Sequence, residues 1–227
     1  NIKVGEGDFV NVDSLATGVL EGVPTSVKKR IVENLDTMYF PEAVVMPYLE
    51  TVQDRIMLEV FRGCIRGCRF CQAGMIYRPV REKSPETLLR QAKCIYEATG
   101  YEEISLTSLS ISDYTKLPEL TDGLIEWTNE KKVNLSLRID SFTKELMEKV
   151  ASVRASSITF APEAGTQRLR DVINKNVTEE DLLRAVSIAY SFKKESVKLY
   201  FMQGLPTETY EDLDGIKELA ESVIDEF

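Results

Sequence analysis

From residue 53 onward, apolar strand-like runs alternate with longer helix-like stretches, and this rhythm limits the folds open to the chain. Strands are predicted at 56–61, 103–109, 133–139, 157–161 and 197–202, and helices at 84–99, 118–131, 144–152, 166–174, 178–194 and 209–226. Such alternation is typical of parallel strands joined by right-handed helical crossovers. The pattern predicts an α/β fold of about five β/α units around a parallel sheet, whereas a closed barrel of eight units would need a longer chain.

The first 52 residues lack this rhythm. Two short helical patterns, at 12–20 and 26–35, lead into segments around Pro41 and Pro47 that we expect to be extended or turned. We therefore interpret residues 1–52 as an N-terminal extension or linker and residues 53–227 as the core.

A run of cysteines follows the first predicted strand. Cys64, Cys68 and Cys71 have the spacing C-x3-C-x2-C. The chain contains no histidine and one further cysteine, Cys94, so a four-ligand zinc finger cannot be completed within it. Three thiolates would leave one iron of a four-iron, four-sulfur cluster open to a small molecule. The alternative is a chance grouping of buried free cysteines, and Cys94 itself is interpreted as a structural thiol.

Arginines crowd the same stretch of an otherwise acidic chain of net charge −9, at Arg62, Arg66, Arg69, Arg78 and Arg81. Their charge would offset that of a thiolate-bound cluster, although an ordinary solvated surface would have the same composition. The acidic balance argues against non-specific nucleic-acid binding. No run reaches the length of a membrane span and no signal peptide is recognised, so we expect no membrane association. Reduced cysteines and an oxygen-sensitive cluster indicate a cytoplasmic setting.

The string from Arg62 to Arg81, with Phe70 just before the last cysteine, resembles the cluster-binding loop of the radical S-adenosylmethionine (SAM) enzymes. It is most similar to uncharacterised fused radical SAM proteins near the cobalamin-binding and methylthiotransferase-like branches. The resemblance implies a partial (β/α)6 TIM-like barrel, here about five units and cut short before the last strand. It also implies a 4Fe-4S cluster on Cys64, Cys68 and Cys71, with SAM on the open iron.

In folds of this kind, functional side chains gather at the C-terminal ends of the strands. After the second predicted strand, Thr107 and Ser108 offer hydroxyls where many relatives carry Gly-Gly-Glu, and a simple polar strand end is the alternative. In the third, strand alternation places Ser136 and Arg138 on one face, where they are predicted to contact the ribose or carboxylate of SAM. An ion pair of Arg138 with Asp140 or Glu163 remains the alternative.

Three further contacts follow from the resemblance. Glu163 matches a Glu-x-Gly-(Ser/Thr) motif that lies beside the ligand, and Lys175 matches a basic residue that pairs with the methionyl carboxylate. Gly204 and Leu205 belong to a Gly-Leu-Pro turn whose backbone abuts the adenine. A surface lysine before a helix cap, for Lys175, and a generic strand–helix turn, for Gly204, are the alternatives.

Together these features predict an enzyme core that cleaves SAM reductively to a 5′-deoxyadenosyl radical and modifies an unknown substrate, with methyl or methylthio transfer as one outcome. The expected partners are SAM, that substrate, and an electron donor such as ferredoxin or flavodoxin. Two other classes remain open. One is an iron–sulfur electron carrier or scaffold, and the other is a binding module with a vestigial cluster.

Overall fold

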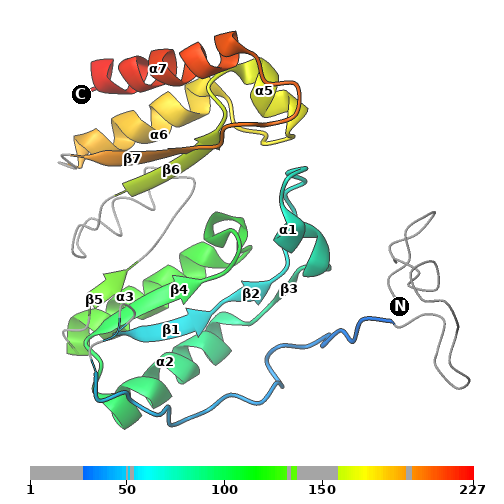
Figure 1. Ribbon diagram of the computed structural model, residues 1–227. Coiled ribbons are helices and arrows are strands. Elements are labelled where there is room, and N and C mark those ends of the chain that lie inside the picture. Colours follow the sequence, from blue (N-terminus) through cyan, green and yellow to red (C-terminus); the bar gives the residue numbers. More distant parts are fainter. Residues whose placement is uncertain (1–27, 50, 52–53, 132–133, 137–157, 193–195) are drawn as a thin grey trace, which may run out of the picture. The chain divides into compact units, whose positions relative to one another are not determined.

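The computed structural model describes residues 28–49, 51, 54–131, 134–136, 158–192 and 196–227. The chain divides into two compact units, residues 1–33 and 34–227, and every described helix and strand belongs to the second (Figure 1). In chain order these are β1 (Ile56–Glu59), β2 (Phe61–Arg62), α1 (Gln72–Ile76), β3 (Arg81–Glu82), α2 (Pro85–Thr99), β4 (Glu103–Thr107), the 3-10 helix η2 (Ile111–Asp113), α3 (Leu117–Lys131), β5 (Asn134–Ser136), β6 (Ile158–Glu163), α5 (Gln167–Val172), α6 (Glu179–Ser191), β7 (Val197–Phe201) and α7 (Tyr210–Asp225).

Parallel pairing of the alternating strands is confirmed. A three-stranded sheet has the order β1-β4-β5, in which Ile56 is paired with Ile104 and Glu103 with Asn134. A second parallel pair joins β6 to β7 and has an irregular register between Phe160 and Glu163. Within the described ranges no strand pairing joins the two sheets and no closed barrel forms. The predicted helix at 144–152 lies outside the described residues.

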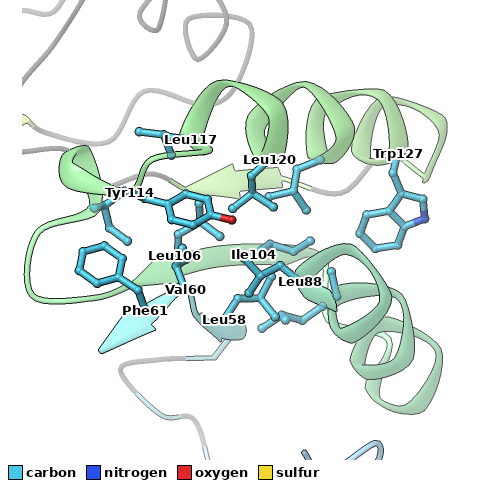
Figure 2. Close-up of a cluster of buried hydrophobic side chains, with 14 of the residues drawn as sticks. Leu58, Val60, Phe61, Leu88, Ile104, Leu106, Tyr114, Leu117, Leu120 and Trp127 are labelled. Atoms are coloured by element: carbon cyan, nitrogen blue, oxygen red, sulfur yellow. The ribbon is translucent and has the colours of Figure 1, made fainter. Parts of the chain in front are cut away.

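The three-stranded sheet is covered by α2 and α3, whose apolar faces meet the strands in one hydrophobic core (Figure 2). Alternate residues of β1 and β4, among them Leu58 and Ile104, are fully buried because the two faces of a strand alternate. Leu88 of α2 and Leu120 of α3 are equally buried against them. Trp127 also packs in this core.

A second core lies between β6, α6 and α7, where Phe160 packs with Val186 and Leu219. The α6 helix begins with a capping box in which the Thr178 hydroxyl accepts from the Asp181 backbone N–H at 3.1 Å. The α2 helix is capped in the same way, since the Ser84 hydroxyl accepts from the Thr87 backbone N–H at 3.2 Å.

The short antiparallel pair β2–β3 and the helix α1 were not predicted, and both frame the cysteine loop. The loop begins at Gly63, whose φ of 93° is in the left-handed region. A Cβ atom there would lie 2.7 Å from the carbonyl oxygen of Pro79, so glycine is required for this close approach.

In the described part of the chain, no helix is both long and apolar enough to cross a lipid bilayer.

Candidate functional site

The cysteine loop runs from the end of β2 to the start of α1 and presents three free thiols. Cys64 is buried, and its Sγ accepts a hydrogen bond from the backbone N–H of Arg66 at 3.3 Å. Cys71 is the N-cap of α1, and its Sγ accepts from the backbone N–H of Gly74, also at 3.3 Å. Backbone N–H groups that point at sulfur stabilise the thiolate form, which is the form that ligates iron.

The three thiols are of the chemical type that ligates iron–sulfur clusters. In the described residues, no group of three or more metal-binding side chains converges closely enough to hold one metal ion. A mononuclear zinc site needs its sulfur ligands about 2.3 Å from one point, whereas a four-iron cluster takes each thiolate on a different iron. Burial raises the pKa of the Cys68 thiol, although the nearby Lys175 ammonium opposes that effect.

The five arginines of this stretch hold the loop and its surroundings together. Arg66 makes a two-pronged ion pair with Asp113, with N···O distances of 2.7 and 2.5 Å. The hydrogen bond to Asp113 raises the pKa of Arg66, and the thiol groups of Cys64 and Cys68 add to that shift. Arg62 pairs with Glu59 at 2.7 Å. These arginines therefore place positive charge beside the thiols while their own positions are restrained.

The other three arginines donate to main-chain carbonyls. Arg69 donates to Val172 at 2.5 Å, Arg78 to Arg66 at 3.1 Å, and Arg81 to Pro79 at 3.0 Å. All three contacts lie at exposed positions, so these side chains are both solvated and hydrogen-bonded to the main chain.

An ion pair from the second sheet meets this loop. Glu163, at the end of β6, lies 3.2 Å from the Nζ of Lys175, and the two side chains are only 16% and 18% exposed. Lys175 also lies over the ring of Phe70, with its Nζ 5.9 Å from the centroid. Two of the predicted ligand contacts are therefore brought together beside the cysteine loop.

The backbone of Glu163 has a φ of 69°, in the left-handed region that side chains other than glycine rarely adopt. Strain of this kind persists where the surrounding structure over-determines it, and it is frequent at functional sites. The irregular register between β6 and β7 lies just before this residue, after Phe160, and pairing resumes between Glu163 and Phe201. The Glu163 carboxylate is therefore held at a fixed place rather than at the end of a flexible turn.

A profile of the radical SAM superfamily matches residues 58–220, which include the cysteine loop, Glu163 and Lys175. The chain belongs to the radical SAM superfamily. Members of this superfamily are enzymes that use a 4Fe-4S cluster and SAM, so the predicted family and cofactors are confirmed.

Relatives of this radical SAM chain include an uncharacterised protein of Methanocaldococcus jannaschii, 37% identical over 74% of the chain and 37% of the relative. The ribosomal protein uS12 methylthiotransferase RimO of Thermoanaerobacter is 24% identical over 95% of the chain and 50% of the relative. The chain thus spans about a third to a half of the length of these relatives.

Among solved structures, the radical SAM methyltransferase TsrM of Kitasatospora setae matches with a TM-score of 0.62 at 12% identity, over 75% of this chain and 35% of that one. This likeness supports the fold, and with it the expected partial TIM-like barrel.

The remaining predicted contacts of the radical SAM site lie at strand ends or outside the described residues. Thr107 Oγ1 donates to the Leu58 carbonyl at 3.1 Å, and Ser108 Oγ accepts from the Ser110 N–H at 3.2 Å. Ser136 ends β5, where only the backbone is described, and Arg138 lies outside the described residues. Their roles as ligand contacts stay predictions.

The turn after β7 contains the last two predicted contacts. Gly204 has a φ of 80°, and its N–H donates to the Glu208 carboxylate at 2.7 Å. A Cβ atom at Gly204 would meet nothing within 4 Å, so its φ, and not crowding, is the reason for glycine. Leu205 is buried in a small cluster with Leu169 and Ile173.

The sequence reasoning missed Asp212, which ties the Glu163 turn to the start of α7. Its buried carboxylate accepts from the Thr166 hydroxyl, from the Arg168 guanidinium and from the Thr209 N–H, the last at 2.8 Å. Burial alone would raise the pKa of Asp212, but these donors outweigh it and lower the pKa well below its usual range. The Thr209-x-x-Asp212 spacing is a capping-box signal that could have identified this residue.

Proposed function

We propose that this chain is the catalytic core of a radical SAM enzyme, in which Cys64, Cys68 and Cys71 hold the cluster. The observation that carries the proposal is the contact between a loop of three free thiols and the partly buried Glu163–Lys175 pair. When bound, the cluster supplies one electron that cleaves a carbon–sulfur bond of SAM to methionine and the 5′-deoxyadenosyl radical. The protein's own part is to bind, orient and shield the reacting molecules.

The Glu163–Lys175 pair is the chemical complement of the amino-acid end of SAM. That end carries one ammonium and one carboxylate, and the pair offers one carboxylate and one ammonium 3.2 Å apart. We assign the ligand ammonium or its ribose hydroxyls to Glu163 and the ligand carboxylate to Lys175. Phe70 screens Lys175 from solvent on one side, which strengthens its electrostatic contact.

Further ligand contacts are assigned to Thr107, Ser108, Ser136, Arg138, Gly204 and Leu205. The 5′-deoxyadenosyl radical would then abstract hydrogen from an unknown substrate, or support methyl or methylthio transfer to it. The methylthiotransferase relatives favour the transfer branch. An electron donor such as ferredoxin or flavodoxin completes the set of partners. We further assign residues 1–52 to an extension or linker and residues 53–227 to the core.

Anaerobic reconstitution with iron and sulfide tests the proposal. We expect about four irons per chain in the wild type, and 5′-deoxyadenosine by mass spectrometry after addition of dithionite and SAM. Cys64→Ala, Cys68→Ala and Cys71→Ala should each abolish 5′-deoxyadenosine formation. Cys94→Ala, the matched control, should retain the wild-type iron content and activity.

A stable cluster without any 5′-deoxyadenosine would contradict the proposal and favour the alternative function, an iron–sulfur electron carrier or scaffold.

A further inference from the structure

The main chain of the three cysteines is held in three different ways. Cys64 lies two residues after Arg62, the last residue of β2, and Cys71 caps α1 and donates its N–H to the Cys68 carbonyl at 3.1 Å. Cys68 belongs to neither a helix nor a strand. Its position therefore depends on contacts made by its neighbours in the loop.

Both neighbours of Cys68 bond to one short segment that follows α5. The side-chain amide of Asn174 donates to the carbonyl of Gly67 at 2.8 Å. On the other side, the N–H of Arg69 donates to the carbonyl of Ile173 at 2.9 Å. The contacts flank Cys68 and hold the middle of the loop against residues from a distant part of the sequence.

Asn174 and Gly67 each have a residue type that this contact requires. Asn174 has a φ of 53°, and asparagine is among the few residues that tolerate the left-handed region. A Cβ atom at Gly67 would lie 2.7 Å from the Asn174 Nδ2, so only glycine lets the amide reach the loop carbonyl. Each residue thus makes the other's hydrogen bond possible.

The same segment continues into Lys175, which pairs with Glu163. A shift of Asn174 would therefore move both the loop around Cys68 and the ammonium assigned to the SAM carboxylate. We propose that Asn174 is a positioning residue that fixes Cys68 and links the cluster loop to the Glu163–Lys175 pair. The role at the cluster rests on the proposed function, whereas the restraint on Cys68 does not.

The restraint is tested on the cluster-free chain of residues 1–227 by timed alkylation with iodoacetamide. Trypsin cleaves after Arg62, Arg66, Arg69 and Arg81, but not at the Arg78–Pro79 bond, so each of the three cysteines lies on its own peptide. Asn174→Gly keeps the left-handed backbone and removes the amide. We expect the alkylation rate of Cys68 to rise about fivefold, the factor for one lost hydrogen bond, with Cys64 and Cys71 as internal references.

Asn176→Gly is the matched control, because Asn176 has the same φ of 53° and its amide bonds to Asn174 rather than to the loop. It should leave all three alkylation rates unchanged. Asn174→Asp keeps the side-chain shape but replaces the amide donor with an acceptor, so it should also raise the alkylation rate of Cys68. It is the test variant if Asn174→Gly unfolds. An unchanged Cys68 rate in a folded Asn174 variant would overturn the proposal.

A second measurement concerns the cluster. After reconstitution of Asn174→Asp, we expect the reduced cluster to give an altered electron paramagnetic resonance spectrum. The change in that spectrum on addition of SAM should also differ from wild type. Asn176→Gly should give the wild-type spectra. A wild-type chain that binds no iron would contradict the proposed function, and the alkylation comparison would still decide the role of Asn174. Spectra of Asn174→Asp identical to wild type would overturn the link to the cluster.

Discussion

The side chains at the ends of β4 and β6, one strand from each parallel sheet, make different kinds of contact. Where β4 ends, the hydroxyls of Thr107 and Ser108 bond to the protein's own backbone within the same sheet or turn. Where β6 ends, Glu163 has a left-handed backbone, pairs with Lys175, and precedes a turn that is tied to α7 through Asp212. The three-stranded sheet carries the larger core, and the cysteine loop follows its first strand through β2.

We therefore expect the two sheets to contribute differently to the candidate site. The first provides a well-packed support for the thiols, and the ligand contacts assigned to its strand-end hydroxyls are neutral hydrogen bonds. The second provides the charged pair Glu163–Lys175, which is partly buried, and Glu163 has a strained backbone. Substitutions at the end of β6 should therefore have larger effects than those at the end of β4.

The largest effect is expected for Gly165→Ala, next to Glu163. A Cβ atom there would lie 2.2 Å from the backbone nitrogen of Ile216 in α7, and a backbone atom cannot move aside as a flexible side chain can. We expect a loss of about 4 kcal/mol in the free energy of unfolding, measured by urea denaturation. Gly100→Ala is the control: its φ is also positive, at 71°, but a Cβ atom would meet nothing within 4 Å, so a loss of about 1 kcal/mol is expected.

Equal losses in the two glycine variants would contradict the view that close packing against α7 holds the Glu163 turn.

Glu163→Gln should reduce the rate of 5′-deoxyadenosine formation more than it reduces the free energy of unfolding. The substitution keeps the shape and removes the negative charge beside Lys175. We expect 5′-deoxyadenosine formation to fall about 100-fold while the iron content stays at the wild-type level. Glu208→Gln, in the exposed turn after β7, is a control for loss of one carboxylate and should retain most of the activity.

A Glu163→Gln protein with wild-type turnover at limiting SAM would show that the pair is structural and does not contact the ligand.

Much of this arrangement could be predicted from the sequence because it depends on local patterns. The strand alternation at Leu58 and Ile104, the caps at Ser84 and Thr178, and the cysteine spacing are all readable within a few residues. The contacts of Asn174 and Asp212 could not be found in this way. They join segments distant in sequence, and their partners are backbone carbonyls or turn hydroxyls that leave no periodic signal.

The short β2–β3 pair and α1 were missed for a related reason. Each is too short to show a periodic apolar pattern, and the hairpin depends on the close approach of Gly63 to Pro79.

Asp212→Asn tests the network at the start of α7 and is expected to cost about 2 kcal/mol of stability at pH 7, because charged hydrogen bonds are replaced by neutral ones. The pKa of Asp212 is lowered in the folded state, so its contribution is complete above the unfolded pKa, near 4. It is lost as the pH falls below that value. The difference between wild type and Asp212→Asn in urea unfolding should therefore shrink from pH 6 to pH 3.

A difference that is constant across this range would show that Asp212 acts through packing rather than through its charge.

The smallest effect is expected at the end of β4. Ser108→Ala removes a hydroxyl that accepts one hydrogen bond, from the Ser110 N–H at 3.2 Å, within its own turn. If the end of β4 contributes less to ligand binding than the end of β6, 5′-deoxyadenosine formation should change less than threefold. The free energy of unfolding should change by about 0.5 kcal/mol. Thr107→Val, which keeps the side-chain volume and removes the bond to Leu58, should behave similarly. A 100-fold loss of activity in Ser108→Ala with intact cluster would instead show that the end of β4 contributes as much to ligand binding as the end of β6.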